Sequence, residues 1–198
     1  MRPRILLSAL VLAAGFAGSA AAADISTHTF TACNLPDTGQ TGDYTATFGE
    51  DPDYRPSGSQ PSYTIYSPGG TSSVTVDNRT GLMWVTNPND AGIASTYSWE
   101  NALLACENTI GAAGTYAGYS NWRLPNVREL ASLVDYGRQN PAINTAYFFN
   151  TQSNFYWSST TITSASNNAW YASFIDGAVT TNTKTNPYNI RCVRGGPP

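Results

Sequence analysis

The stretch of sequence that decides the fold runs from residue 121 to residue 130 and reads Asn-Trp-Arg-Leu-Pro-Asn-Val-Arg-Glu-Leu. Asn126, followed three residues later by Glu129, is typical of a capping box, in which the two side chains bind free backbone N–H groups at the start of a helix. The apolar residues behind it recur at helical spacing and include Val127, Leu130, Ala131 and Val134. The stretch therefore predicts a helix that starts at Val127, turns its apolar face inward and ends near Gly137.

Two more short motifs follow in the chain. Residues 156–160 read Tyr-Trp-Ser-Ser-Thr, and residues 191–194 read Arg-Cys-Val-Arg. Like the first stretch, each joins a bulky aromatic residue or a cysteine to polar residues, and none contains a usual catalytic pairing of side chains. The motifs therefore describe the fold directly and the function only indirectly.

A further helix is predicted from Trp99 to about Asn108, with Ser98 placed to cap its first turn. Its apolar residues fall at positions i, i+3, i+4 and i+7, which form one face of a helix: Trp99, Ala102, Leu103 and Cys106. This face is expected to pack against the core.

Strand-like runs make up most of the remaining sequence. They are Ser62–Tyr66, Ser73–Asp77, Leu82–Trp84, Phe155–Thr161, Ala169–Phe174, Ala178–Thr183 and Tyr188–Arg194. Turn residues at 78–81 predict a hairpin between the second and third runs, and Asp176-Gly177 predicts a tight turn between the fifth and sixth. The sequence therefore predicts an α+β fold in which two helices pack on an antiparallel sheet.

The chain begins with the three parts of a secretory signal peptide. A basic start, Met1–Arg4, precedes the apolar run Ile5–Ala17, and small residues at 21–23 supply a cleavage site. The apolar run is shorter than the ~20 residues that span a bilayer, so cleavage is favoured over a membrane anchor. We therefore expect residues 1–23 to be removed and the protein to be exported to the periplasm, the cell surface or the medium, without a membrane span.

Export changes the charge of the chain. Loss of Arg2 and Arg4 leaves 8 basic against 13 acidic residues, a net charge of −5. Most of the imbalance lies in residues 24–72, which are rich in Thr, Ser, Gly and Pro and are predicted to form an irregular acidic extension ahead of a domain spanning 73–198. An acidic exported protein is a poor ligand for nucleic acid, so no such partner is expected.

Three cysteines remain in a compartment that permits disulfides, and an odd number leaves one thiol over. Cys106 lies in a predicted helix and Cys192 in the last predicted strand, so we pair these two. Cys33 is then free, buried or available to another chain.

These blocks together resemble the Lcl C-terminal domain family, which is named for the end of a bacterial collagen-like adhesin. The resemblance spans about Val74 to Arg194, although the Gly-x-y repeats of the adhesin are absent here. It rests on residues 80–84, Trp99 with Ala102 and Cys106, residues 121–130, 156–160 and 170–174, Gly177, Lys184, and residues 191–194. The resemblance implies a C-type lectin-like fold, related to the formylglycine-generating enzymes and to the variable proteins of diversity-generating retroelements.

The residues argue against an enzyme. His28 is the sole histidine and lies in the extension, so a Ser-His or Cys-His arrangement would depend on it. The related formylglycine-generating enzymes use a reactive cysteine pair, whereas Cys106 and Cys192 match structural positions of the fold. No cofactor is expected. Acidic residues at 50–53 offer oxygen ligands of the kind that Ca²⁺ takes, but we interpret them as a solvated turn.

In the implied fold the ligand surface is usually built from the last strands and their loops. Residues 164–168 and 180–189 are rich in Asn, Thr, Ser and Tyr, which suit sugar hydroxyls and protein surfaces alike. The candidate binding residues are Asn167, Asn168, Tyr171, Asn182, Lys184, Asn186, Tyr188 and Arg191. Strand alternation places Tyr171 opposite the core-directed Trp170, Ala172 and Phe174. Ordinary hydrophilic loops are the alternative interpretation.

Three further assignments complete this picture. Most of the tryptophans are assigned to core packing. Arg123 is expected to bond loop carbonyl groups, and Lys184, Arg191 and Arg194 are candidates for a local basic patch.

Two functions from different classes follow. The first is an exported, adhesin-like recognition module that binds a glycan or a surface protein. The second is a structural subunit or tip protein of a cell-surface or envelope assembly, with homo-oligomer contacts through the extension or Cys33.

The cysteine pairing gives a direct test. Peptide mapping under non-reducing conditions is expected to recover Cys106 linked to Cys192, a bridge that in the chain-entropy model stabilises the fold by ~4–5 kcal/mol because it closes a long loop. Recovery of Cys33 linked to either residue would contradict the assignment.

Overall fold

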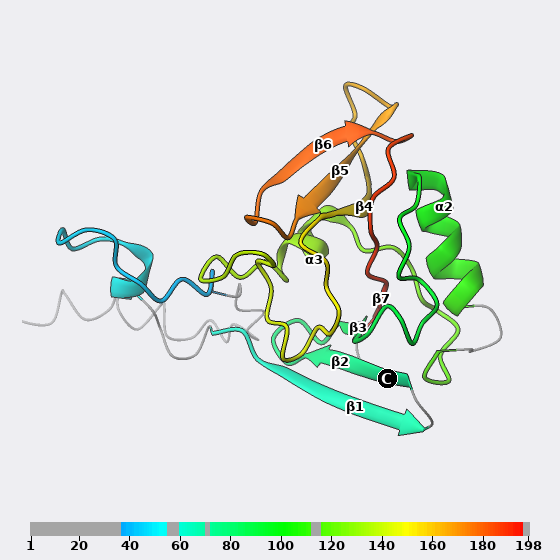
Figure 1. The fold of residues 1–198 in the computed structure, drawn as a ribbon, viewed down its shortest axis with the longest axis horizontal. Coiled ribbons are helices and arrows are strands. Elements are labelled where there is room, and N and C mark those ends of the chain that lie inside the picture. Colours follow the sequence, from blue (N-terminus) through cyan, green and yellow to red (C-terminus); the bar gives the residue numbers. More distant parts are fainter. Residues whose placement is uncertain (1–36, 55–59, 70–71, 112–115, 196–198) are drawn as a thin grey trace, which may run out of the picture. The chain divides into compact units, whose positions relative to one another are not determined.

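The computed structural model describes residues 37–54, 60–69, 72–111 and 116–195. The chain divides into residues 1–33 and 34–198, and every residue described below belongs to the second unit. Its elements are η1 (Asp51–Tyr54), β1 (Tyr63–Gly69), β2 (Ser72–Asp77), β3 (Met83–Val85), α2 (Trp99–Leu104), η2 (Ala105–Ile110), α3 (Val127–Ala131), β4 (Phe155–Thr161), β5 (Asn168–Ser173), β6 (Val179–Thr183) and β7 (Val193–Arg194) (Figure 1).

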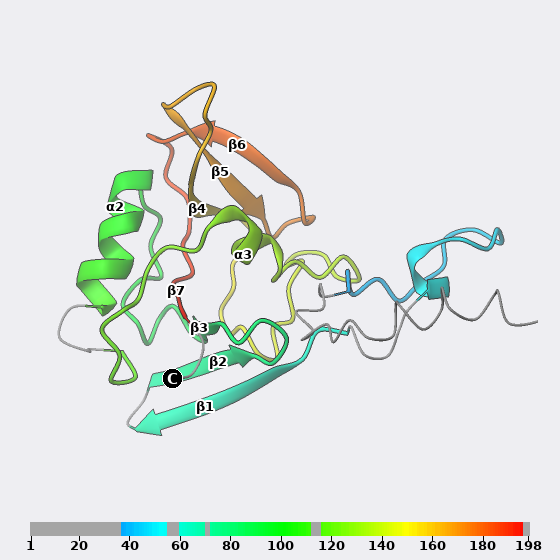
Figure 2. The same ribbon diagram turned by 180° about the vertical axis from the view of Figure 1, so that it is seen from behind.

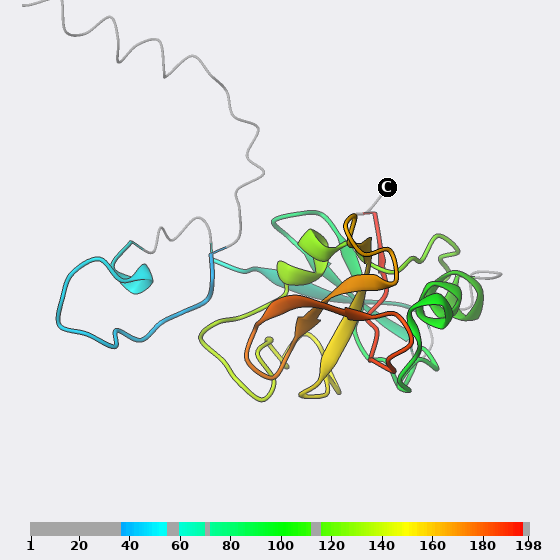
Figure 3. The ribbon, with the colours of Figure 1, turned by 90° about the horizontal axis from the view of Figure 1, so that it is seen from above.

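The strands form two small antiparallel sheets. One has the order β1-β2-β3-β7 and the other β4-β5-β6. The expected antiparallel sheet is thus divided into two, and helices α2 and α3 both contact β4 (Figure 2). Viewed from above, α2 lies at one end of the domain (Figure 3). The arrangement confirms an α+β fold.

The last predicted strand is much shorter than expected. Only Val193 and Arg194 form β7, which pairs with Met83 and Trp84 of β3. The preceding residues instead follow β4, where Trp157 donates its N–H to the carbonyl oxygen of Asn189 at 3.0 Å. One segment therefore runs along the second sheet before it joins the first.

The first predicted helix is confirmed, with a change of geometry halfway. α2 continues as the π-helical turn η2, and Ala102 and Cys106 are buried in the core while Trp99 and Leu103 pack against it. Ser98 is the N-cap residue, but its side chain makes no capping hydrogen bond.

The second helix begins as predicted and ends early. The capping box of Asn126 and Glu129 is present. The helix stops at Ala131, not near Gly137, because the following backbone N–H groups bond elsewhere: Asp135 donates to Ala142 and Tyr136 to Thr38. Leu130, Leu133 and Val134 are nevertheless all buried.

Arg123 does not bond loop carbonyls. Its guanidinium group forms a two-pronged ion pair with the Glu129 carboxylate at 2.6 and 2.7 Å. The same carboxylate accepts the backbone N–H of Asn126 at 2.8 Å. Burial raises the pKa of Glu129, but the hydrogen bonds from Arg123 and Asn126 outweigh it, and the pKa lies below its usual value. The ion pair therefore holds the capping carboxylate in place.

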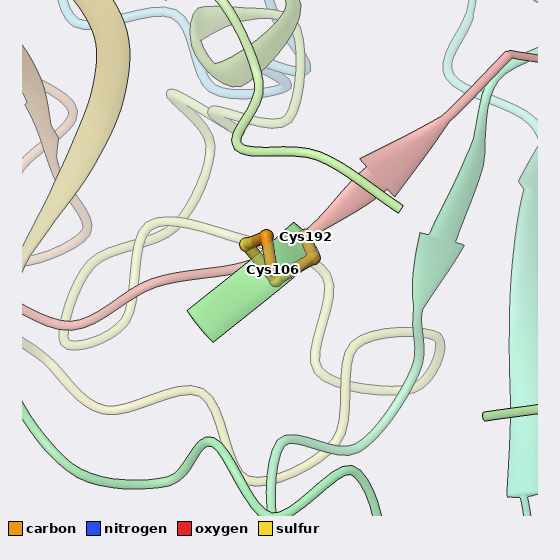
Figure 4. The surroundings of a disulfide bond; sticks show 2 residues. All are labelled: Cys106 and Cys192. Carbon is orange, nitrogen blue, oxygen red and sulfur yellow. A yellow bond between two sulfur atoms is a disulfide. The ribbon is translucent and has the colours of Figure 1, made fainter. Parts of the chain in front are cut away.

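The disulfide between Cys106 and Cys192 is confirmed (Figure 4). The two Cα atoms lie 5.6 Å apart across a sequence separation of 86 residues. It joins η2 to the segment directly before β7 and lies in the core. Cys33, His28 and residues 1–23, the predicted signal peptide, lie outside the described residues.

The tryptophans divide into two groups. Trp84, Trp122 and Trp157 are almost completely buried, which confirms that most of them pack in the core. Trp99 and Trp170 are half-buried. Trp122 packs edge-on against the rings of Tyr116 and Tyr119 at 5.5 and 6.5 Å.

The extension is partly integrated into the domain. β1 pairs with β2, so the first sheet reaches upstream of residue 73, where we placed the start of the domain. Thr38 accepts a hydrogen bond from the backbone of Tyr136 at 2.8 Å. Near η1, Asp53 accepts the backbone N–H groups of Gly49 and Glu50, which makes this acidic stretch a self-bonded turn.

The burial of Trp122 predicts a purely structural effect. We expect Trp122→Ala to lower the free energy of unfolding by about 3–5 kcal/mol, as for other buried aromatic truncations. Tyr44→Ala is the control, because this ring is 81% exposed and such surface changes fall within about 0.5 kcal/mol. Urea unfolding measures both. A Trp122 variant that unfolds like the parent protein but loses a ligand would reveal a binding residue instead.

Candidate recognition surface

The structure brings most of the candidate binding residues to one end of the β5–β6 hairpin. In the β5–β6 ladder Asn168 lies opposite Thr183, and Ala169 lies opposite Asn182. Just beyond the ladder, the Lys184 N–H donates to the carbonyl oxygen of Asn167 at 2.9 Å. We call the set Asn167, Asn168, Asn182, Lys184 and Asn186 the polar rim.

A four-residue turn positions the charged member of the polar rim. Asn186 donates its N–H to the carbonyl oxygen of Thr183 at 3.0 Å, which closes the turn that carries Lys184. The Lys184 ammonium group lies 3.8 Å from the centre of the Trp99 ring. Trp99 in turn donates its backbone N–H to Lys184 and its indole N–H to Ser158. The cation is therefore held in place by a ring that is itself anchored at both ends.

Below the polar rim lies an aromatic cluster of Phe155, Trp157, Tyr171 and Tyr188. The Tyr188 ring lies 4.5 Å from Trp157 and 5.0 Å from Tyr171, and Phe155 lies 5.0 Å from Tyr171. Asn182 donates its side-chain amide to the Tyr188 hydroxyl, and Trp157 donates its indole N–H to the carbonyl oxygen of Asn186. The cluster thus supports the rim through direct hydrogen bonds.

Burial corrects the role expected of two tyrosines. Tyr171 and Tyr188 are only 8% and 7% exposed. Tyr171 does lie on the face opposite Ala172, as alternation predicts, but the segment carrying Tyr188 covers that face. Burial, with the neighbouring Tyr188, raises the pKa of Tyr171. Both side chains therefore act as supports beneath the surface.

Arg191 was also expected to be a binding residue at the surface, and the structure places it in the interior instead. It is completely buried and donates to the carbonyl oxygens of Val85 and Thr86 and to the Thr151 hydroxyl. Burial lowers its pKa. Arg194 is buried too, with its guanidinium 3.9 Å from the Tyr119 ring. The expected basic patch therefore does not form, and Lys184 supplies the positive charge of the polar rim.

Trp99 and Phe155 are the site residues that sequence reasoning missed. Trp99 was assigned to the apolar face of a helix, and the structure shows that its ring also contacts the Lys184 ammonium group. Its position as the first residue of α2 is the available signal, because no preceding helical turn covers its ring. Phe155 gave no comparable signal.

No group of three or more His, Cys, Asp or Glu side chains that could hold a metal ion occurs among the described residues. Likewise, none of the helices in the described ranges is long and apolar enough to cross a membrane.

The fold is thus an α+β domain with two antiparallel sheets, closed by a disulfide between a helix and the chain end and carrying a polar rim over an aromatic cluster. The chain belongs to the Lcl C-terminal domain family, whose model matches residues 73–194. A comparison with curated proteins found no match. The matched region contains the whole polar rim and aromatic cluster and excludes β1.

Burial predicts opposite effects for the cluster and the rim. Tyr171→Ala and Tyr188→Ala are expected to lower the free energy of unfolding by on the order of 3 kcal/mol each, because each removes a buried ring. Lys184→Ala is expected to cost about 0.5–1 kcal/mol, the usual range for an exposed cation–π contact. Chemical denaturation distinguishes these outcomes. Unchanged stability in both tyrosine variants would mean that the rings are not packed as described.

Proposed function

We propose that this protein is an exported, non-enzymatic recognition module with a C-type lectin-like fold that binds a glycan or a surface protein through the polar rim. Membership of the Lcl C-terminal domain family supports the fold assignment. The observation that carries the function is the fixed position of Lys184 over Trp99, among amide side chains that rest on a buried aromatic cluster.

The chemistry of the polar rim suits a hydroxyl-rich ligand. Asparagine amides both donate and accept hydrogen bonds, which matches sugar hydroxyl groups and peptide groups. The half-buried side chains of Asn168, Asn182, Lys184 and Asn186 are already restricted by their surroundings. Binding therefore costs less conformational entropy than it would on a free loop.

The ionisable groups with displaced pKa values support a non-catalytic role. The pKa of Tyr116 is raised to about 12, chiefly by burial, and its hydroxyl donates to the carbonyl oxygen of Ser73. Glu129 and Arg191 bond to structural partners, as described above. Each of these three groups is occupied in holding the fold.

A structural role in a cell-surface or envelope assembly is the second candidate function. The observation that favours it is the outer edge of β1, which no other described strand covers and which another chain can extend.

A binding measurement tests the recognition surface. The purified protein is applied to a glycan array and to a panel of extracellular surface proteins, and the hits are measured again with Lys184→Ala and Asn186→Ala. Each variant is expected to weaken binding about tenfold while it folds normally, and binding of an anionic ligand is expected to weaken further at high salt. Arg138→Ala is the matched charge control, because Arg138 pairs with Asp135 away from the rim. Ligands that bind both rim variants normally would refute the proposed surface.

A further inference from the structure

β1 forms an open edge of the first sheet. In the order β1-β2-β3-β7 it pairs with β2 on one side, and no other described strand pairs with its second side. Figure 1 shows the strand along the outer border of the sheet. The edge is well formed, because Tyr63 to Tyr66 keep an unbroken antiparallel register with Asp77 to Val74.

The register determines which backbone groups face outward. Asn78 donates its N–H to Ser62 at 2.8 Å, so Ser62 belongs to a hydrogen-bonded pair with β2. Because bonding direction alternates along a strand, Thr64 and Tyr66 also bond to β2. The N–H and C=O groups of Tyr63 and Ile65 therefore point away from the sheet. The register shifts after Tyr66. Ser67 nevertheless stays on the outer side, because Ser73, which its hydroxyl group contacts, gives its carbonyl oxygen to Thr86 on the far side of β2.

This edge lacks the usual protection against pairing. Edge strands commonly carry charged residues, especially lysine, or a proline that removes an outward donor. No charged residue occurs between Arg55 and Asp77. Pro68 follows the outward residues and is not one of them, so all three outward donors remain.

An apolar groove adjoins the open edge. Its volume is about 300 Å³, and its lining includes Val74, Val76, Met83, Tyr66 and Tyr119. Tyr66 stands at the edge beside this groove, with 53% of its surface exposed.

We propose that β1 is the contact through which two copies of this chain associate, with the two β1 strands antiparallel about a two-fold axis at Ile65. In this register Ile65 faces Ile65 of the other copy, and Tyr63 faces Ser67. Every outward N–H of one copy then meets an outward C=O of the other, which shifted registers do not achieve. The contact is isologous, so it closes at a dimer.

The side chains fit the same register. Tyr66 lies opposite Thr64 of the other copy, and Thr64 lies next to Val76 in the β1–β2 ladder. The exposed Tyr66 ring of each copy therefore lies over Thr64 and Val76 of the other copy, and Val76 lines the other copy's groove. A second copy is the occupant that this edge fits best, because its own sequence supplies both the complete ladder and the ring, and the uncharged strand carries no repulsion.

Hydrogen exchange on the purified full chain tests the proposal at single-residue resolution. As protein concentration rises, the sedimentation coefficient is expected to increase from that of a monomer to that of a dimer. In parallel, the amides of Tyr63, Ile65 and Ser67 are expected to exchange at least about tenfold more slowly. The amides of Thr64 and Tyr66 are the internal control, since they already bond to β2 and are protected at all concentrations.

Two variants of the exposed Ser67 distinguish loss of the edge contact from damage to the fold. Ser67→Pro removes an outward N–H without touching the β2 ladder, and is expected to raise the dimer dissociation constant at least about tenfold. Ser67→Ala keeps the N–H and loses only the side-chain contact with Ser73, so it is expected to dimerise like the parent protein.

Three outcomes would overturn the proposal. The first is a monomer at every concentration, and the second is a dimer that Ser67→Pro leaves unchanged. The third is a dimer that survives denaturation without reductant, which would place the link at Cys33. Because the polar rim lies in the other sheet, loss of ligand binding in rim variants leaves this test unaffected.

Discussion

The structure depends on a buried positive charge that is held by backbone carbonyls. Removing a guanidinium group from water is costly, and the cost is offset only if its donors are bonded. Arg191 meets this condition at both terminal nitrogens, which donate to the carbonyl oxygens of Val85 and Thr86 and to the Thr151 hydroxyl, while its buried Nε has no partner among the described residues. These groups come from the end of β3 and from the loop before β4. The charge can therefore be buried only when the end of β3 and the loop before β4 are both in place, directly beside the disulfide at Cys192.

Local sequence patterns predicted the parts of the fold that local forces decide. The capping box at Asn126, the apolar face containing Cys106 and the β2–β3 hairpin all depend on neighbours a few residues apart, and all are present. The division into two sheets could not be predicted, because one segment, residues 188–194, serves both of them. Long-range backbone pairing of this kind leaves no periodic signal in the sequence.

The candidate site was harder to predict from the sequence than the fold, for the same reason. Composition identified residues that lie together in space, since four asparagines and Lys184 do gather at one end of the β5–β6 hairpin. Composition did not distinguish exposed binding residues from the buried residues beneath them. Strand alternation did not do so either, because it says which face a residue occupies but not whether another segment covers that face. Tyr171 and Arg191 were misjudged for this reason, whereas Trp99 acquired a role only through the distant Lys184.

If the protein is exported as proposed, the disulfide bears on how it withstands extracellular proteases. The bridge spans α3 and all three strands of the second sheet, which lie between Cys106 and Cys192. Exposed small residues at 164–166 form a loop tip of the kind that proteases cut first. A single cut there opens the chain but releases nothing, because both fragments stay covalently joined. The polar rim thus tolerates nicking that would separate the two halves of an unbridged domain.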